Sequence, residues 1–347
     1  MRLRTGLHVI WRARDEVQIG TDPRWAVRLT ALTAGEVELL LALGGGESSR
    51  SLTTRDRALG VPSVRLDSLL TVLDRAQLMA REDDGRSTVT TPLPPPGAGP
   101  DAATWTRLLT DGDGGGLLAA RHTRVVGLLG AGRLGLSAAV TLAAAGVGSV
   151  LVEDDLPVSP ADLGVGGYTT RDLGISRRAA AARVLRDVAP QVLTTAPERT
   201  RPDVMVLVEH GAADALRAQA LMSAAVVHLS VVVREADVMV GPLVRPGASA
   251  CLRCLDLHRT DADACWPAVA AQLVGAGRSH GTDEETVLAA IAGPLTAAQV
   301  LAQLDGTFPR TLGAALEIAL PDAVPRVRAW PVHPRCGCTD LAASRGR

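Results

Sequence analysis

Four cysteines form two closely spaced pairs, one in the second half of the chain and one near its end. Cys251 and Cys254 are separated by two residues, and Cys336 and Cys338 by one, in loop-like surroundings. Four thiolates are the ligand set of a closed tetrahedral zinc site, which leaves no open position for hydrolysis. We therefore predict a structural Zn²⁺ site that joins distant parts of the chain. Scattered buried thiols, the alternative, would not produce two tight pairs.

Two further residues leave alternatives open near this site. His333 precedes the second pair and is a reserve ligand, because the Cys336–Cys338 spacing is tighter than that of the first pair. Cys265 is the fifth cysteine, and no paired base lies close to it in the sequence. It is interpreted as an apolar filler or a loop residue, with a nucleophile or a redox site as the alternatives.

A glycine-rich turn is the second chemical signal. Gly130, Gly132 and Gly135 follow an apolar run and open a helical pattern, and Glu153 ends the next apolar run. Glycines let a phosphate approach the backbone, a helix N-terminus offers unpaired N–H groups, and the acidic residue accepts ribose hydroxyls. This spacing favours nucleotide binding, and a turn that only closes the chain is the alternative. Arg133 either binds a phosphate or fills the pocket.

Strand and helix patterns alternate around this turn. Val125–Leu129 and Val150–Val152 are short apolar runs, and Leu136–Ala145 between them has helical character. Val204–Val208 and Val226–Val233 add β-branched runs of the kind that is buried in a parallel sheet covered by helices. The sequence therefore predicts an α/β fold, with a doubly wound, mostly parallel Rossmann-like sheet, over residues 115–347.

The residues before this domain follow a different pattern. A small antiparallel sheet is predicted from three short runs, Leu7–Trp11, Val17–Ile19 and Trp25–Leu29. Thr33-Ala-Gly-Glu36 is a capping box that starts a helix, and Val64–Leu78 has apolar residues at helical spacing. We expect a winged-helix-like α+β domain over residues 1–91. The Pro- and Gly-rich run that begins at Pro92 predicts a semi-rigid linker over residues 92–114.

The composition excludes several classes of function. The chain contains neither Lys nor Asn, so a P-loop lysine, a lysine Schiff base and an Asn-linked glycan are impossible. A formal net charge of -1 gives no reason to expect a nucleic-acid partner. The start of the chain lacks a secretory apolar core, and Leu136–Val152, the most apolar stretch, is interrupted by glycines. We expect a soluble cytoplasmic protein with no membrane partner.

Taken together, the glycine turn, the acidic strand end and the cysteine pairs resemble the ThiF/MoeB superfamily, the bacterial relatives of ubiquitin-activating enzymes. The resemblance extends over about residues 115–340 and includes Gly146–Asp155, Arg171–Gly174 and the helix around Gly293. Members use ATP and magnesium to adenylate the C-terminal carboxylate of a small protein or peptide, and they are commonly dimers. The resemblance implies Asp155 and Arg177 as catalytic residues if this chain adenylates. It also implies nucleotide contacts from Gly130, Gly132, Arg133, Gly135, Glu153, Asp155 and Arg177.

Three positions depart from the pattern of active members. Gly164 lies near the place of an arginine, Arg177 replaces a lysine, and His210 falls on or beside a magnesium-holding carboxylate, with Glu209 adjacent. Fixed cations and metal stabilise a transferring phosphoryl group, and losing one contact can cost about a hundredfold in rate. The departures imply that adenylation is weakened or lost. An ordinary strand-end role for His210 is the alternative.

The N-terminal pattern, with Val17–Gly20 and Trp25–Val27, resembles the leader-recognition modules of ribosomal peptide biosynthesis. Fused to a ThiF-like domain, it is similar to the partner proteins of azoline-forming YcaO-type cyclodehydratases. The resemblance implies a scaffold that binds the leader of a precursor peptide, by strand addition and helix contact, and presents it to a modifying enzyme. The alternatives are an adenylyltransferase that activates a carboxyl terminus, an NAD(P)-dependent enzyme, and an N-terminal domain used for dimer contact or DNA binding.

Overall fold

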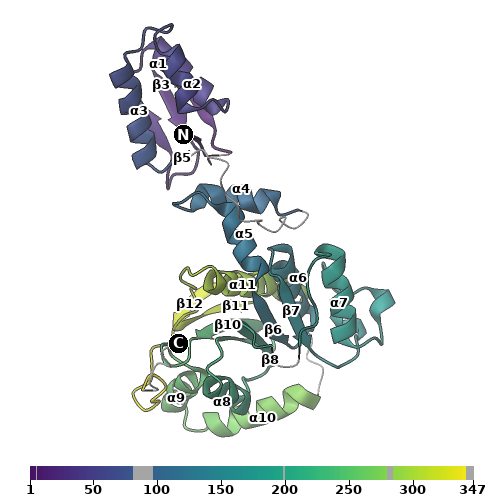
Figure 1. Cartoon of the computed structure of the whole chain (residues 1–347). Helices are drawn as coiled ribbons and strands as arrows, with labels where there is room; N and C mark the ends of the chain where they lie inside the picture. The colour runs from purple at the N-terminus through teal and green to yellow at the C-terminus, as the bar shows by residue number, and fades with distance from the viewer. Residues whose placement is uncertain (5, 81–96, 198–199, 280–283, 341–347) are drawn as a thin grey trace. The chain divides into compact units, whose positions relative to one another are not determined.

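The computed structural model describes residues 1–4, 6–80, 97–197, 200–279 and 284–340 (Figure 1). The chain divides into two compact units, Met1–Ala119 and Ala120–Arg347. The first unit contains a three-stranded antiparallel sheet in the order β2-β3-β4, formed by Val9–Ala13, Glu16–Ile19 and Val27–Leu29. This confirms the predicted antiparallel sheet. β1 (Arg2–Leu3) pairs separately with β5 (Met79–Ala80).

Three helices cover this sheet, namely α1 (Ala34–Gly44), α2 (Ser49–Arg55) and α3 (Ser63–Arg75). The predicted capping box is confirmed, because the Thr33 side chain accepts from the Glu36 N–H at 3.3 Å and the Glu36 carboxylate accepts from the Thr33 N–H at 2.7 Å. The core of this unit is aliphatic and combines residues of β3, α1 and α3: Val17, Ile19, Leu39, Leu40, Leu43, Leu66, Leu69 and Leu73.

The predicted linker contains regular structure. Its residues 92–96 lie outside the described part of the chain, but α4 (Gly99–Leu108) and the start of α5 (Gly114–His122) occupy much of the rest. Pro100 stands in the first turn of α4, where a fixed φ suits the helix and a missing N–H breaks no bond. Arg4 donates to the carbonyl oxygens of Leu109 and Thr110 just beyond α4. This segment is therefore packed and helical in part.

The second unit is built on a seven-stranded sheet in the part of the chain that the structure describes. Its order is β12-β11-β10-β9-β8-β6-β7, with β9, β8, β6 and β7 parallel and β10, β11 and β12 antiparallel. The strands are Val125–Leu129, Ser149–Glu153, Val204–His210, His228–Val233, Asp237–Val244, Ala314–Ala319 and Arg326–Ala329, for β6 to β12 in chain order. The predicted α/β class is confirmed, and the parallel strands carry the glycine turn.

Helices cover both faces of this sheet. Figure 1 shows α6 (Arg133–Ala144) and α11 (Thr286–Leu304) on one face, and α8 (Ala215–Ser223), α9 (Leu252–Ala262) and α10 (Trp266–Ser279) on the other. α7 (Arg177–Val188) packs against α6 and β7 and follows two short 3₁₀ turns, Pro160–Asp162 and Thr170–Asp172. The alternation of strands and helices therefore produces a doubly wound architecture.

α11 is long and apolar enough to cross a membrane, but it is a core helix of this unit. Leu288, Ala292 and Val300 are buried in the cluster that α6 and the sheet also form. At Gly293 a Cβ atom would lie 2.6 Å from Ser137 Oγ on α6, so the two helices are in close contact. The run Thr282-Asp-Glu-Glu285 predicts a cap for this helix. Glu285 caps the helix, and residues 282 and 283 lie outside the described part of the chain.

A buried ion pair joins the end of α11 to α5. Arg121 and Asp305 are 2% and 3% exposed, and Arg121 Nη2 donates to Asp305 Oδ2 at 2.7 Å. Arg121 also donates to the carbonyl oxygen of Ala145, which follows α6. This pair therefore fixes three segments of the second unit that are distant in the sequence.

Candidate functional site

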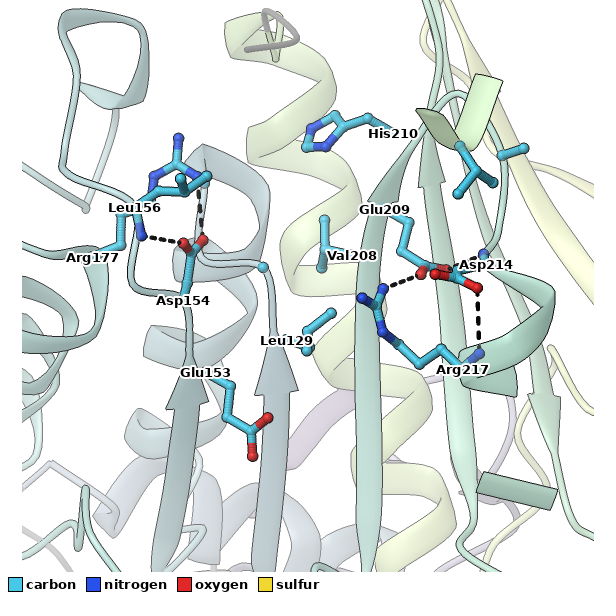
Figure 2. Close-up of a pocket in the computed structure, with 14 residues that line it drawn as sticks. Leu129, Glu153, Asp154, Leu156, Arg177, Val208, Glu209, His210, Asp214 and Arg217 are labelled. Carbon is cyan, nitrogen blue, oxygen red and sulfur yellow. Dashed lines mark hydrogen bonds and ion pairs between the residues drawn. The ribbon is translucent and has the colours of Figure 1, made fainter. Parts of the chain in front are cut away.

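A cavity of about 330 Å³ lies at the carboxyl ends of β6, β7 and β8 (Figure 2). Leu129 and Gly130 line it from β6, Glu153 and Asp154 from β7, and Val208–His210 from β8. The chain leaves β6 toward β7 on one side and later adds β8 on the other side. This is the topological switch point of the sheet, where open α/β sheets bind their ligands.

The predicted glycine turn forms one wall of the cavity. Gly130 has φ +87°, and a Cβ atom there would lie 2.4 Å from the Val208 carbonyl oxygen of β8. A Cβ atom at Gly135 would lie 2.0 Å from the carbonyl oxygen of Gly130. Only glycine fits either position, so these residues are needed for the turn and for the close approach of α6 to the strands.

Asp154 is the carboxylate that closes this turn. Its side chain accepts from the backbone N–H groups of Ala131 at 2.8 Å and Leu156 at 3.1 Å. Asp155, which the sequence analysis selected, is instead 78% exposed, pairs with Arg178 and lines a separate cavity beside α7. Neighbouring side chains of extended backbone point to opposite sides, so Asp154 and not Asp155 faces the glycine turn. The nucleotide contact of Asp155 stays a prediction.

Arg177 lies beside Asp154 and is held by two carboxylates. Its guanidinium donates to Asp154 Oδ2 at 3.2 Å and to Asp162 Oδ1 at 2.6 Å, and all three side chains are largely buried. Burial opposes the charge, but both aspartates outweigh it and raise the pKa of Arg177. The Tyr168 hydroxyl lies 3.0 Å from the Ala131 carbonyl oxygen and 3.1 Å from that of Arg177. The turn and Arg177 are thus fixed by one hydrogen-bonded network.

The other predicted contacts divide between the cavity and the helices. Glu153 and Gly132 line the cavity. Arg133 does not line it, because its Nη1 donates to the Glu284 carbonyl oxygen at 2.8 Å and to Thr286 Oγ1 at 3.0 Å. It therefore connects α6 to the start of α11. Arg133 therefore does not fill the cavity in this structure, and the predicted phosphate contact stays a prediction.

The opposite wall combines Glu209 and His210, which the sequence singled out, with Arg217 and Asp214, which sequence reasoning missed. Arg217 on α8 donates to Glu209 Oε1 at 2.5 Å, and the Asp214 N–H donates to Glu209 Oε2 at 3.2 Å. Burial is the largest influence on Glu209 and raises the pKa of its carboxyl group despite Arg217. Asp214 also caps α8, which is a signal that an aspartate before a helical pattern gives in the sequence. His210 ends β8, and its Nε2 lies 3.0 Å from Glu284 Oε1.

The charges that line the cavity are mainly negative. Glu153, Asp154, Glu209 and Asp214 contribute carboxylates, whereas Arg177 and Arg217 contribute the guanidinium groups. Both arginines are already engaged by carboxylates of the chain, as Figure 2 shows. Among the described residues that line the cavity, no cation that could meet an anionic ligand is free of a carboxylate partner.

The four predicted zinc ligands come together in the second unit. The sulfur atoms of Cys251, Cys254, Cys336 and Cys338 lie within 4.8 Å of one another. The Cys251–Cys336 and Cys254–Cys338 sulfur distances are both 3.5 Å, and the Cys251–Cys254 distance is 4.0 Å. Tetrahedral ligands at the usual Zn–S bond length are separated by about 3.8 Å. The geometry therefore fits Zn²⁺, which would connect the start of α9 to the C-terminal turn.

The electrostatics of this cluster also fit a cation. Burial and the neighbouring sulfur atoms raise the pKa of the Cys338 thiol to about 12 and also raise that of Cys336, whereas, despite burial, hydrogen bonds to the Cys254 thiol lower its pKa. Four thiolates at such distances need a divalent ion to offset their mutual repulsion. His333, the reserve ligand, is not in the cluster, because its Nε2 lies 2.8 Å from Asp261 Oδ2. Cys265 is exposed between α9 and α10, as expected of a loop residue and not of an apolar filler.

Comparison with known proteins identifies the family and the fold. A model of the ThiF family matches residues 107–338, which is about two thirds of the chain. Escherichia coli MccB in complex with ATP has a TM-score of 0.67 and 13% identity, with 97% of this chain and 98% of that chain covered. The microcin C7 biosynthetic enzyme MccB in complex with N-formylated MccA has a TM-score of 0.70, 13% identity, and coverage of 97% and 99%.

PaaA is also similar, with a TM-score of 0.67, 16% identity, and 94% of this chain and 98% of that chain covered. No curated protein sequence matches the chain. Likeness at these identities concerns the fold alone, but it includes the small N-terminal antiparallel region as well as the larger α/β unit.

Proposed function

The chain belongs to the ThiF family, and from this premise we propose that it is a zinc-containing scaffold that binds the leader of a ribosomally made precursor peptide and presents it to a separate modifying enzyme. In this proposal the adenylation reaction of the family is weakened or lost. Two structural features support it, one in each unit. They are the engaged arginines of the cavity and the open sheet of the N-terminal unit.

The main observation behind the proposal is that the arginines around the glycine turn are all bonded to groups of the chain itself. Arg177 lies between Asp154 and Asp162, Arg217 is bonded to Glu209, and Arg133 points to α11. Transfer of an adenylyl group needs cations that are positioned to stabilise the charge on the transferring phosphate. Each of these arginines would first have to leave a carboxylate or a carbonyl oxygen. ATP and magnesium therefore fit this cavity poorly, and no step of the proposed function uses them.

The four cysteines fit the zinc ion that the proposal includes. Cys251, Cys254, Cys336 and Cys338 would hold it, and it would supply a crosslink between α9 and the C-terminal turn with no open position for chemistry. The role of the ion is therefore to stabilise the scaffold. We place the protein in the cytoplasm, where such cysteines remain reduced.

The N-terminal unit supports capture of a peptide. In the described residues β2 and β4 are the edge strands of their sheet, so each has an outer edge without a paired strand. Trp11 on β2 is 64% exposed, and Val64 and Val72 on α3 are exposed as well. An extended peptide that adds a strand gains main-chain hydrogen bonds, and exposed apolar side chains supply selectivity. We therefore propose that the leader pairs with this sheet and contacts α3.

The same reasoning proposes the partners of the scaffold. A precursor peptide with a leader is the ligand, and a YcaO-type cyclodehydratase is the enzyme that modifies it. We further propose that the scaffold is a homodimer, as is common in the family. Neither nucleic acid nor a membrane has a part in this function.

An adenylyltransferase remains the second candidate, because 97% of the chain aligns with the MccB structure that contains ATP. Two measurements separate the candidates: fluorescence anisotropy of a labelled leader peptide, and ATP–pyrophosphate exchange with the full precursor. We expect leader binding that needs no ATP, and no exchange above background. Peptide-dependent exchange that Arg177→Ala abolishes would establish the adenylyltransferase and refute the scaffold. A nicotinamide absorbance change with turnover would instead indicate a dehydrogenase.

A further inference from the structure

Glu284 places a carboxylate at the N-terminus of α6, where the glycine turn ends. Its Oε2 accepts from the backbone N–H of Leu134 at 2.5 Å, and the residue is 6% exposed. Glu284 lies about 150 residues after the turn and just before α11. A distant part of the chain therefore supplies an anion to the helix N-terminus.

This position is the one that a phosphate would need. The first N–H groups of a helix have no partner within the helix, and together with the helix dipole they attract an anion. In this chain the Leu134 N–H is already bonded to Glu284, and the Ala131 N–H of the same turn is bonded to Asp154. Two donors that a nucleotide phosphate would use are thus engaged by internal carboxylates.

The surroundings of Glu284 are shaped to hold its side chain. A Cβ atom at Gly132 would lie 2.6 Å from Glu284 Oε1, so the absence of a side chain there leaves room for the carboxylate. His210 Nε2 lies 3.0 Å from the same oxygen. Arg133 Nη1 donates to the Glu284 carbonyl oxygen at 2.8 Å. Contacts from β8 and α6 therefore fix both the backbone and the side chain of this residue.

Glu284 adjoins the cavity through Gly132 and His210, which line it. We propose that Glu284 determines the ligand specificity of the cavity, as an internal anion at the N-terminus of α6 that excludes nucleotide phosphates. A phosphate that enters must displace the carboxylate from the Leu134 N–H or meet its negative charge at close range. The glycine turn then serves to attach α11 to α6. This inference goes beyond the proposed scaffold function, because it assigns the exclusion of nucleotide to one residue.

Isothermal titration calorimetry of the full-length protein with MgATP tests the inference. The variants are Glu284→Ala and Glu284→Gln. Glu285→Gln is the matched control, because Glu285 is exposed and this substitution removes the same charge one residue away. We expect MgATP to bind Glu284→Ala at least about tenfold more tightly than the wild type. One hydrogen bond to a charged group contributes about this factor to affinity. Glu284→Gln, which keeps the shape, should give a smaller gain of about threefold, and Glu285→Gln no gain.

Equal MgATP affinity of the wild type and both Glu284 variants would overturn the inference, as would an equal gain in Glu285→Gln. If Glu284→Ala does not fold, judged by its melting temperature and zinc content, the comparison of Glu284→Gln with Glu285→Gln decides. Leader binding and pyrophosphate exchange of the wild type are measured in parallel. Exchange by the wild type would refute the scaffold function, whereas the difference between variants reports on Glu284 alone.

Discussion

Replacement of Cys254 by serine is expected to release the zinc ion and to destabilise the second unit. The Cys254 side chain is fully buried, and its sulfur lies 3.5 Å from that of Cys338 and 4.0 Å from that of Cys251. A serine hydroxyl is a poor ligand for Zn²⁺, which prefers thiolate and imidazole donors. The variant therefore retains three of the four thiolates, at a site where the protein offers no replacement ligand among the described residues.

The magnitude follows from the loop that the ion closes. About 80 residues separate the two cysteine pairs, and a crosslink of this span restricts the unfolded chain by about 4.5 kcal/mol. For a unit of this size each kcal/mol corresponds to about 2–4 °C in the midpoint of thermal unfolding. The account therefore predicts that Cys254→Ser unfolds about 10 °C or more below the wild type.

The assay combines elemental analysis with thermal unfolding followed by circular dichroism. The wild type should contain nearly one zinc per chain and should lose stability when a strong chelator is added. Cys265→Ser is the matched control, because Cys265 is exposed and lies outside the cluster. Wild-type zinc content and an unchanged midpoint in Cys254→Ser, or equal losses in Cys265→Ser, would refute the zinc site.

Three further predictions concern stability and peptide binding. Asp305→Asn leaves the buried Arg121 guanidinium without its carboxylate, and urea unfolding should show a loss of about 3–5 kcal/mol; a loss near zero would contradict this. Although burial opposes ionisation, hydrogen bonds from Thr169 and Arg183 lower the pKa of Asp172 below its ordinary value of 3.8. The contribution of Asp172 to stability is therefore complete above pH 3.8 and is lost as the pH falls through its folded-state pKa. Asp172→Asn should flatten the decline of the free energy of unfolding at acid pH. An unchanged decline would be evidence against the ion pair of Asp172 with Arg183. Val72→Glu on the exposed face of α3 should weaken leader binding by about tenfold or more in anisotropy titrations, because it removes an apolar contact and adds a charge. Thr71→Glu should leave leader binding unchanged. Equal effects of the two substitutions would exclude this face of α3 as the leader-binding surface.

Local sequence patterns predicted the parts of the fold that depend on local interactions. The capping box at Thr33 needs only residues that are three positions apart, and the glycine turn at Gly130 has a fixed place between a strand and a helix. Both are confirmed. The cysteine pairs were predictable for a different reason, because four soft ligands in two tight pairs have few other uses.

The features that the sequence does not specify are those that depend on tertiary contacts. Pro100 was interpreted as part of a linker, although proline is also favoured in the first turn of a helix. A strand end does not specify which of two adjacent aspartates faces the turn, and here it is Asp154, whereas Asp155 pairs with Arg178. Glu284 belongs to the run Thr282–Glu285 that predicts a helix cap. Its contact with the Leu134 N–H could not be predicted, because it depends on the packing of α11 against α6, which only the folded chain provides.

Reconstitution of the modification reaction tests the central claim most directly. A candidate precursor peptide and a YcaO-type cyclodehydratase are incubated with ATP, with and without the purified protein. The loss of water from the precursor is followed by mass spectrometry. The account predicts that modification requires this protein and the leader, and that Val72→Glu slows it while Thr71→Glu does not. Equal modification without the protein, or of a leaderless precursor, would contradict the claim that it captures and presents the peptide.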